Sequence, residues 1–303
     1  MRVVVFGAGA IGCLVGVHLS RRHDVTLVAR PHVAQAIARD GVRFEGLTEG
    51  TFRMHAVANV RDAPREPDWT FVTVKAYDTE AACRELREHV RGGNVVTLQN
   101  GLGNLEQVEG AFGAERAFAA STSHGVMAVG PAQWRHAGLG DFVVGPSMPA
   151  SYEGAQALAD ELTQAGLDCR ATLDIRGELW GKAIVNAAIN PVAALALVPN
   201  GRLLEDERLR AEMDAAAREA WEVAKAVGVA LPPGDWVEKA REVARRTAAN
   251  RNSMLQSLEA GKRTEIESIT GVVVREGVRS GVPVPVNARL LERVRAASAQ
   301  GSR

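Results

Sequence analysis

The stretch that decides the fold is residues 2–12, RVVVFGAGAIG. The β-branched run RVVVF predicts a buried strand, and it leads directly into Gly7, Gly9 and Gly12 in G-x-G-x-x-G spacing. After a strand and before a helix, the first glycine permits a tight turn, the second lets amides approach a pyrophosphate, and the third allows close packing. A plain strand-to-helix turn is the alternative. The context favours a Rossmann-type dinucleotide site made by Gly7, Ala8, Gly9, Ala10, Ile11 and Gly12.

The composition is that of a soluble globular protein with room for two domains. The chain has 303 residues with 46% hydrophobic and 24% charged residues, which is an ordinary balance. Acidic and basic residues number 36 each, so bulk charge predicts no nucleic-acid or anionic-membrane partner. Three cysteines without CxxC spacing predict neither a disulfide framework nor a zinc site. We therefore expect a protein of the reducing cytoplasm, with no metal.

The N-terminal run MRVVVFGAGAIGCLVGVHLS also has the basic residue and apolar stretch of a signal peptide. Its spaced glycines and its strand-like start favour the folded-domain interpretation instead. No other stretch approaches the roughly 18 uninterrupted apolar residues that a membrane span needs.

The first half of the chain alternates apolar runs with helical patterns. Strands are predicted at 2–7, 24–30, 69–75 and 94–100, and helices at 10–20, 31–39 and 78–91. This alternation predicts an α/β fold with a parallel sheet covered on both faces. A hairpin of VRFEG and TFRMHAV is expected within it, followed by antiparallel strands over 116–145, a helix at 152–165 and a strand at 167–172.

Strand signals nearly vanish after Asp174. Helices are predicted at 174–188, 201–228, 235–249, 253–260, 264–280 and 287–299. We therefore place a domain boundary near residue 173. Residues 1–173 form the expected Rossmann-type domain, and residues 174–303 form an expected all-α domain.

Polar residues follow three of the predicted parallel strands, where ligands bind in such folds. Arg30 stands where an NAD site usually has a carboxylate, and a guanidinium there would bind a 2′-phosphate. Arg30 therefore predicts NADP, unless it is only a solvated strand end. Lys75 and Asn100 are placed to meet the cofactor, although Asn100-Gly101 is also a common turn.

The helical stretch ELWGKAIVNAAINP, residues 178–191, carries Lys182, Asn186 and Asn190 four residues apart. Four residues are close to one turn, so the three side chains form a column on one face. A snorkelling lysine explains Lys182 alone, but each buried amide needs partners or costs about 1–3 kcal/mol. A polar ligand explains the column more easily than packing does.

The chain resembles the ketopantoate reductase (2-dehydropantoate 2-reductase) family. The resemblance lies in RGELWGKAIVNAAINPVAAL, VPNG, NRNSMLQSLEAGKRTEIESITG and GVPVP, together with VVVFGAGAIG, TVKA and QNGLGN, in the same order over nearly the whole chain. It implies reduction of the 2-oxo group of ketopantoate with NADPH, giving pantoate on the route to pantothenate and coenzyme A. It also implies that residues 1–173 are the Rossmann NADP-binding domain, that residues 174–303 are a helical domain for substrate binding and catalysis, and that the active site lies in the cleft between them.

The resemblance also implies roles for single residues. Lys182 matches the catalytic lysine, and Glu265 matches a glutamate beside that lysine and the cofactor. Positions near the substrate are matched by Asn186, Asn190, Asn200, Asn250 and Ser253.

Several alternatives stay open. Asn200-Gly201 could be a helix-cap turn, Ser253 a helix N-cap, and Glu265 a first-turn carboxylate. His124 either lines the site or is a satisfied strand-end histidine. A reductase of another branched 2-oxo acid would keep Lys182, Glu265 and the glycines, and an NADPH-sensing protein is a further alternative. The sequence allows a homodimer but does not fix the oligomeric state.

Overall fold

The computed structural model describes residues 1–301, so residues 302 and 303, which the expected second domain includes, lie outside the described part. Contacts divide the chain into two units. Unit 1 contains Met1–Gln99 and Asn104–Ile175, and unit 2 contains the short segment Asn100–Gly103 and the chain from Arg176 onward. The sequence places the boundary at 173, and the contacts change after Ile175. The expected α/β fold class with a helical C-terminal region is confirmed.

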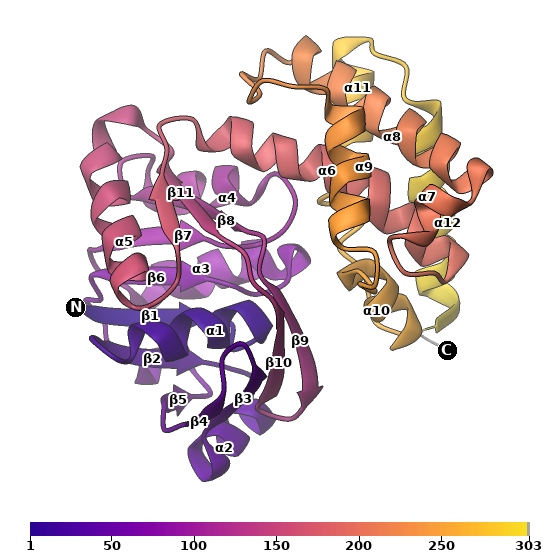
Figure 1. Cartoon of the computed structure of the whole chain (residues 1–303). Helices are drawn as coiled ribbons and strands as arrows, with labels where there is room; N and C mark the ends of the chain where they lie inside the picture. The colour runs from indigo at the N-terminus through magenta and orange to yellow at the C-terminus, as the bar shows by residue number, and fades with distance from the viewer. Residues whose placement is uncertain (302–303) are drawn as a thin grey trace. The chain divides into compact units, whose positions relative to one another are not determined.

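An eight-stranded sheet forms the centre of unit 1 (Figure 1). In spatial order it contains β12 (Cys169–Ala171), β11 (Phe142–Pro146), β8 (Ala117–Thr122), β7 (Asn94–Thr97), β6 (Trp69–Val72), β1 (Arg2–Phe6), β2 (Asp24–Val28) and β5 (His55–Val57). The strands from β8 to β5 run parallel, whereas β11 pairs antiparallel with β8. The carboxyl ends of these parallel strands therefore meet at one edge, which is the ligand edge of such folds.

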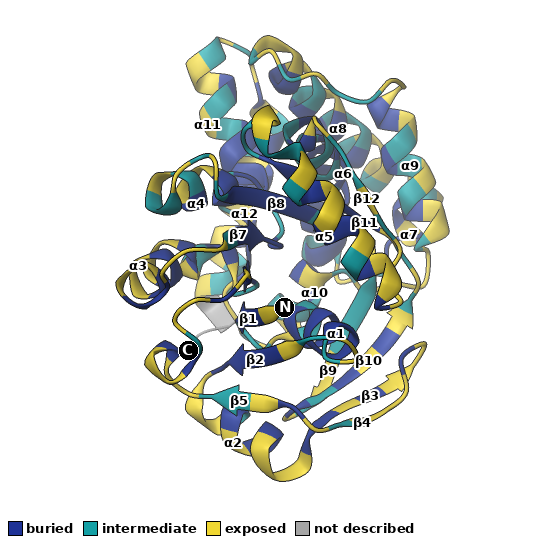
Figure 2. Cartoon of the chain, turned by 90° about the vertical axis from the view of Figure 1, so that its left-hand side faces the viewer, coloured by how far each residue is buried: buried dark blue, intermediate teal, exposed yellow. Residues whose placement is uncertain are grey.

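Helices cover both faces of this sheet (Figures 1 and 2). One face carries α1 (Ala10–Leu19) and α5 (Tyr152–Gln164), the other α3 (Thr79–His89) and α4 (Asn104–Phe112), and α2 (Pro31–Asp40) packs on β5. The sequence interpretation missed α4 and expected only antiparallel strands over 116–145. That expectation was wrong for β8, because α4 carries the chain back and lets β8 pair parallel with β7.

A second sheet covers the other side of α1. It contains β4 (Gly50–Phe52), β3 (Val42–Gly46), β10 (Gln133–Gly138) and β9 (Gly125–Gly130), in that spatial order. Because α1 packs on both β2 and β9, every residue from Gly12 to Leu19 is buried, which explains why the helix is apolar on all sides. The expected hairpin is correct only as far as β4. Met54 is buried in the core, and the chain beyond it continues as β5 beside β2.

Unit 2 is built from helices, as expected. They are α6 (Ile175–Ala196), α7 (Arg202–Glu205), α8 (Glu207–Ala226), α9 (Trp236–Arg246), α10 (Ser253–Glu259), α11 (Thr270–Ser280) and α12 (Pro285–Gly301). Helix α6 continues through Pro191 instead of ending before it. The single helix expected at 201–228 is two helices, because the Asp206 carboxylate accepts from the amides of Arg208 and Leu209 and starts α8.

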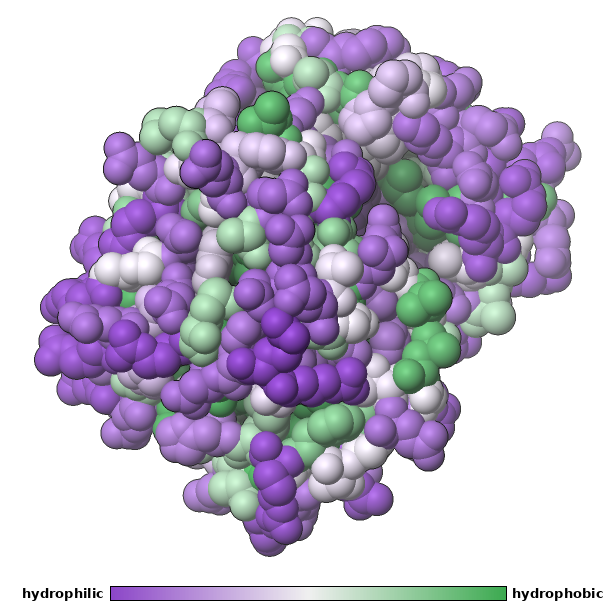
Figure 3. Space-filling view, turned by 60° about the vertical axis from the view of Figure 1, so that its left-hand side comes forward, coloured by the Kyte–Doolittle hydropathy of each residue, from purple (hydrophilic) through white to green (hydrophobic). Residues whose placement is uncertain are grey.

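Helix α6 is the apolar centre of unit 2. Its length and composition would suffice to span a membrane, but 67% of its apolar window is buried within the protein. The core helix of a soluble protein has this same character. In Figure 3 the face in view is mainly hydrophilic.

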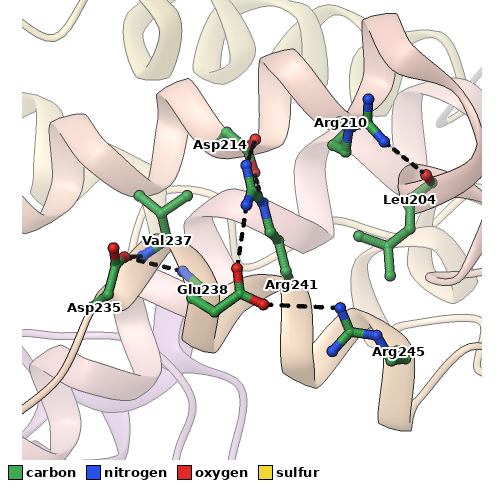
Figure 4. Close-up of polar contacts among 8 residues, drawn as sticks. All are labelled: Leu204, Arg210, Asp214, Asp235, Val237, Glu238, Arg241 and Arg245. Atoms are coloured by element: carbon green, nitrogen blue, oxygen red, sulfur yellow. Dashed lines mark hydrogen bonds and ion pairs between the residues drawn. The ribbon is translucent and has the colours of Figure 1, made fainter.

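An ion-pair cluster joins α8 to α9 (Figure 4). The Arg241 guanidinium donates to both carboxylate oxygens of Asp214 at 3.0 and 2.5 Å, and to Glu238 at 3.1 Å. The Asp235 side chain accepts from the amides of Val237 and Glu238 and begins α9. Since Asp214 is mostly buried and the contact is bidentate, this pair fixes the two helices more firmly than an exposed ion pair would.

Candidate functional site

The glycine turn between β1 and α1 has the geometry that the sequence predicts. Gly7 has a φ of +117°, and a Cβ there would lie 2.6 Å from the amide nitrogen of Val74. A Cβ on Gly12 would lie 2.2 Å from the carbonyl oxygen of Gly7. Both positions therefore require glycine for local packing. Gly9 is different, because nothing lies within 4 Å of the Cβ that it lacks.

The N-terminus of α1 is open to an anion. Gly9 is the N-cap and supplies no side chain, and the first turn contains no acidic residue. The first backbone bond of the helix runs from the Cys13 amide to the Gly9 carbonyl, at 2.8 Å. The amides of Ala10, Ile11 and Gly12 precede it, so they have no partner within the helix and carry its positive dipole end.

Thr73 braces this turn, although the sequence interpretation did not single it out. Its hydroxyl lies 2.6 Å from the Gly7 carbonyl and 3.3 Å from the Phe6 carbonyl. The Gly7 amide donates to the carbonyl of Val28 on β2, at 2.9 Å. The turn is thus held by both neighbouring strands.

Arg30 and Lys75 lie at the same edge of the sheet as the glycine turn. Arg30 is exposed and follows β2, where it is the N-cap of α2. Lys75 is exposed and follows β6, where it is the N-cap of the short helix η2 (Ala76–Asp78). Because β1, β2 and β6 are parallel neighbours, the structure brings Gly7, Arg30 and Lys75 to one edge.

Asn100 follows β7 at this edge and begins the segment that groups with unit 2. Next to it, Gly101 has a φ of +87°, and a Cβ there would lie 2.4 Å from the carbonyl oxygen of Ser268. The Leu102 amide donates to that same carbonyl at 2.7 Å. Asn100-Gly101 is therefore a tight packing point and not only a turn.

The polar column is present on α6. Lys182 and Asn186 are partly buried, and Asn190 is 7% exposed. Within residues 1–301, neither the Asn186 nor the Asn190 amide has a side-chain hydrogen bond. The surrounding positions of the helix, such as Ile184, Ala187 and Ala188, are completely buried in the apolar core of unit 2. The column is thus a polar strip within an apolar environment.

Asn200, Asn250 and Asn252 come together where two loops meet. The Asn200 amide group donates to the Thr247 hydroxyl at 2.9 Å, and its oxygen accepts from the Asn252 amide group at 3.0 Å. The backbone amide of Asn200 also donates to the Asn250 carbonyl, at 3.0 Å. Asn200 therefore already has protein partners at both ends of its side chain, whereas the Asn250 side chain is exposed.

Two alternatives for the second domain are wrong. Ser253 is not the N-cap of α10, because the Asn252 side chain accepts from the amides of Met254 and Leu255 and Ser253 is the first helical residue. Glu265 is not in a first helical turn, since the helix expected from 264 begins at Thr270. Glu265 instead lies in the preceding turn segment and is 8% exposed, which is rare for a carboxylate.

His124 ends a buried chain of hydrogen bonds in unit 1. Its Nδ1 lies 2.9 Å from His136 Nε2, His136 Nδ1 lies 2.9 Å from the Thr48 hydroxyl, and that hydroxyl lies 3.1 Å from His18 Nε2. His18 Nδ1 must donate to the Ala165 carbonyl at 3.0 Å, which fixes the direction of every bond along the chain.

Burial favours the neutral form of the three histidines in this hydrogen-bonded series. Burial, and then the neighbouring His136, lower the pKa of His124 to about 4, and burial also lowers the pKa values of His18 and His136. The ring of His124 packs on Phe142 with centroids 5.1 Å apart. Its Nε2 is buried and has no partner within the described part of the chain.

Comparison with known proteins adds a family to this geometry. The model of the family described as Ketopantoate reductase PanE/ApbA matches residues 3–148, and its C-terminal model matches residues 174–298. The 2-dehydropantoate 2-reductase of Archaeoglobus fulgidus is 39% identical over 97% of this chain and 97% of its own. That of Halobacterium salinarum is 37% identical over 99% of this chain and 100% of its own.

Solved structures agree with these relatives. A PanE/ApbA family ketopantoate reductase from Ralstonia eutropha is 32% identical, covers 100% of both chains and has a TM-score of 0.91. D-mandelate dehydrogenase, solved with NADH and anilino(oxo)acetate, is 22% identical with a TM-score of 0.92 and shares the fold. The two family models together match most of the chain, on both sides of the change from sheet to helices. The chain belongs to the ketopantoate reductase family of oxidoreductases.

Proposed function

We propose that the protein reduces 2-dehydropantoate (ketopantoate) to pantoate with NADPH, in the cytoplasmic biosynthesis of pantothenate and coenzyme A. The observation that carries the proposal is the α6 column, in which two amides with no side-chain hydrogen bond in the described part of the protein follow a lysine on one face of the helix. Relatives named 2-dehydropantoate 2-reductase support the choice of substrate. A homodimer remains a prediction.

The residues at the ligand edge of unit 1 fit a dinucleotide. Space beside Gly9 and the open N-terminus of α1 suit a pyrophosphate, because amides and helix dipole both favour an anion there. The exposed guanidinium of Arg30 would bind the 2′-phosphate that distinguishes NADPH from NADH. Lys75 and Asn100 follow the next two parallel strands and would contact the remainder of the cofactor. The nicotinamide supplies the hydride when the cofactor is bound.

In the proposed reaction, residues of unit 2 donate the proton and bind the substrate. Hydride addition to the 2-oxo carbon leaves negative charge on the former carbonyl oxygen. The Lys182 ammonium would hydrogen-bond that oxygen and donate a proton to it. Glu265, a nearly buried carboxylate, would orient the ammonium and accept a hydrogen bond from the substrate hydroxyl.

The remaining polar residues of unit 2 would hold the substrate. Asn186 and Asn190 are proposed to donate to its oxygens, and Asn250 and Ser253 to bind its hydroxyl and carboxylate. Asn200 would reach the substrate only with its second amide hydrogen or second lone pair, since Thr247 and Asn252 occupy the others. Its main role would then be to hold the loop of Asn250.

A spectrophotometric assay of NADPH absorbance with a panel of 2-oxo acids tests the proposal. We expect turnover with ketopantoate and much slower turnover with pyruvate and 2-oxoisovalerate. Turnover with another branched 2-oxo acid, but not with ketopantoate, would contradict the substrate assignment and leave a reductase of the same architecture. Cofactor binding without turnover of any substrate would point to a sensor protein instead.

A further inference from the structure

A buried carboxamide lies against the loop that carries Lys75, one residue before Asn100 in the sequence. It belongs to Gln99, which is 7% exposed and follows β7. The last backbone bond between β7 and β6 runs from the Leu98 amide to the Val72 carbonyl, at 3.0 Å. One residue later the side chain continues the connection, because Gln99 Nε2 donates to the carbonyl of Val74 at 2.9 Å.

The other groups of this carboxamide are also engaged. Gln99 Nε2 donates its second hydrogen to the Thr79 hydroxyl at 2.7 Å, and Gln99 Oε1 accepts from the Thr97 hydroxyl at 2.9 Å. Because the Val74 carbonyl only accepts, the orientation of the carboxamide is fixed. All partners lie within unit 1.

The network extends through Thr79 to Asn104. The Thr79 hydroxyl lies 2.9 Å from the Ala76 carbonyl and 2.9 Å from Asn104 Oδ1. Thr79 and Asn104 are the first residues of α3 and α4, and both are buried. Segment 74–79 is therefore joined to Gln99 and to Asn104 through the side chains of Gln99 and Thr79.

We propose that Gln99 is a positioning residue for the cofactor site: its carboxamide fixes the loop of Lys75 against the end of β7 and, through Thr79, against the first residue of α4. The inference rests on the proposed function, in which Lys75 and Asn100 contact the nicotinamide cofactor. Gln99 acts through its neighbours and touches neither cofactor nor substrate. Loosening it should weaken cofactor binding while the substrate groups of unit 2 stay unchanged.

The test compares Gln99→Met and Gln99→Glu with the wild-type protein. Methionine keeps the length of the side chain but makes none of the hydrogen bonds. We expect the Kd for NADPH, measured by its fluorescence, and the KM for NADPH to rise about tenfold. The KM for ketopantoate should stay within about twofold, because its proposed contacts come from residues 182–265 and not from the network of Gln99.

The Gln99→Glu variant supplies a readout that general destabilisation would not move. Ionised glutamate cannot donate to the Val74 carbonyl, whereas the protonated acid has one hydrogen to donate. NADPH affinity relative to wild type should therefore recover as the pH falls from 8 to 5.5. A ratio that does not change with pH would contradict the proposed donor role.

His89 provides a matched control, because it lies at the C-terminal end of α3, the helix that begins with Thr79. The buried His89 of α3 makes one hydrogen bond, 2.8 Å long, to the Ala63 carbonyl. His89→Leu should lower Tm as Gln99→Met does but leave NADPH affinity unchanged. Equal weakening by both, or a folded Gln99→Met with NADPH affinity within twofold of wild type, would overturn the positioning role.

The proposed function fails separately from this inference. Wild-type protein that binds NADPH without reducing ketopantoate would remove the substrate assignment, and the binding comparison would still decide the role of Gln99. Wild-type protein that binds neither NADPH nor NADH would overturn both.

Discussion

Two buried amides, one in each unit, differ in what surrounds them. Gln99 and Asn190 are both 7% exposed. The carboxamide of Gln99 uses both hydrogens and its oxygen on partners within unit 1. Asn190 has no side-chain hydrogen bond within residues 1–301. An unsatisfied buried amide costs about 1–3 kcal/mol. The bonded Gln99 therefore has the character of a structural residue, whereas Asn190 has that of a residue that binds a ligand.

Among the tests of this contrast, the largest effect is expected at Lys182, the charged residue of the polar column on α6. We expect Lys182→Ala to reduce kcat at least about a hundredfold, because general acid catalysis is typically worth 10²–10⁴-fold. That range corresponds to roughly 3–5 kcal/mol of barrier at 1.36 kcal/mol per decade. NADPH should still bind. Near-normal turnover in folded Lys182→Ala would remove the proposed general acid.

Glu265 sharpens this test. If Lys182 and Glu265 act as a unit, Glu265→Ala should also reduce kcat substantially, and the double variant should lose much less than the product of the two single losses. Steady-state kinetics of the four proteins measures this. Losses that simply multiply would indicate two independent roles.

Arg30 offers a test at the ligand edge of unit 1. Arg30→Ala should weaken NADPH binding by about 1.5–3 kcal/mol, the range for hydrogen bonds to charged groups. NADH binding should change little, because NADH lacks the 2′-phosphate. Titration of both cofactors provides the measurement, and equal losses would show that Arg30 does not recognise the phosphate.

Two asparagines of unit 2 provide a matched pair that could break the contrast directly. Asn190→Ala should raise the KM for ketopantoate about tenfold with Tm nearly unchanged or raised, since no protein hydrogen bond is lost. Asn200→Ala should lower stability by about 1–2 kcal/mol, because Thr247 and Asn252 each lose one hydrogen bond. Kinetics and thermal unfolding distinguish the two. The reverse pattern would mean that the column is structural.

The smallest expected effect involves the histidine chain of unit 1. The pKa of His124 falls from 6.5 to about 4 on folding, mainly through burial, against the opposing charges of Asp141 and Asp168. The unfolded chain thus binds more protons below pH 6.5, so stability is complete above that pH and declines towards pH 4. After allowance for the partial exposure of His124, its contribution to the free energy of unfolding is about 1 kcal/mol.

Thermal unfolding between pH 7 and 5 measures this effect. His124→Gln, which can still donate to His136, should reduce the loss of Tm with falling pH. The exposed His32 is the control, and His32→Gln should leave the slope unchanged. A slope in His124→Gln equal to that of wild type would exclude His124 as a source of acid sensitivity.

The features that could be predicted from the sequence are those that depend on residues close together in the chain. The spacing of Gly7, Gly9 and Gly12 and the period of Lys182, Asn186 and Asn190 are short-range patterns, so the turn and the column were predictable. Thr73 and Gln99 lie inside the motifs TVKA and LQNG, yet their roles depend on Gly7 and Thr79, which are distant in sequence.

Errors arose where tertiary contacts decide the outcome. The direction of β8 depends on α4, and the start of α11 depends on packing that no cap residue announces. Pro191 ended α6 by local rules, but the continuous apolar surface beyond it, through Val192, Ala193 and Ala194, is completely buried and keeps the chain helical.

The position of α1 between two sheets has a consequence for synthesis of the chain. Helix α1 ends at Leu19, but the sheet that covers its second side is complete only with Gly138, about 120 residues later. At translation rates of about 5–20 residues per second, this interval lasts about 6–24 seconds. During that time the nascent chain exposes the apolar surface of α1. Chaperone capture and premature aggregation would both act on this helix.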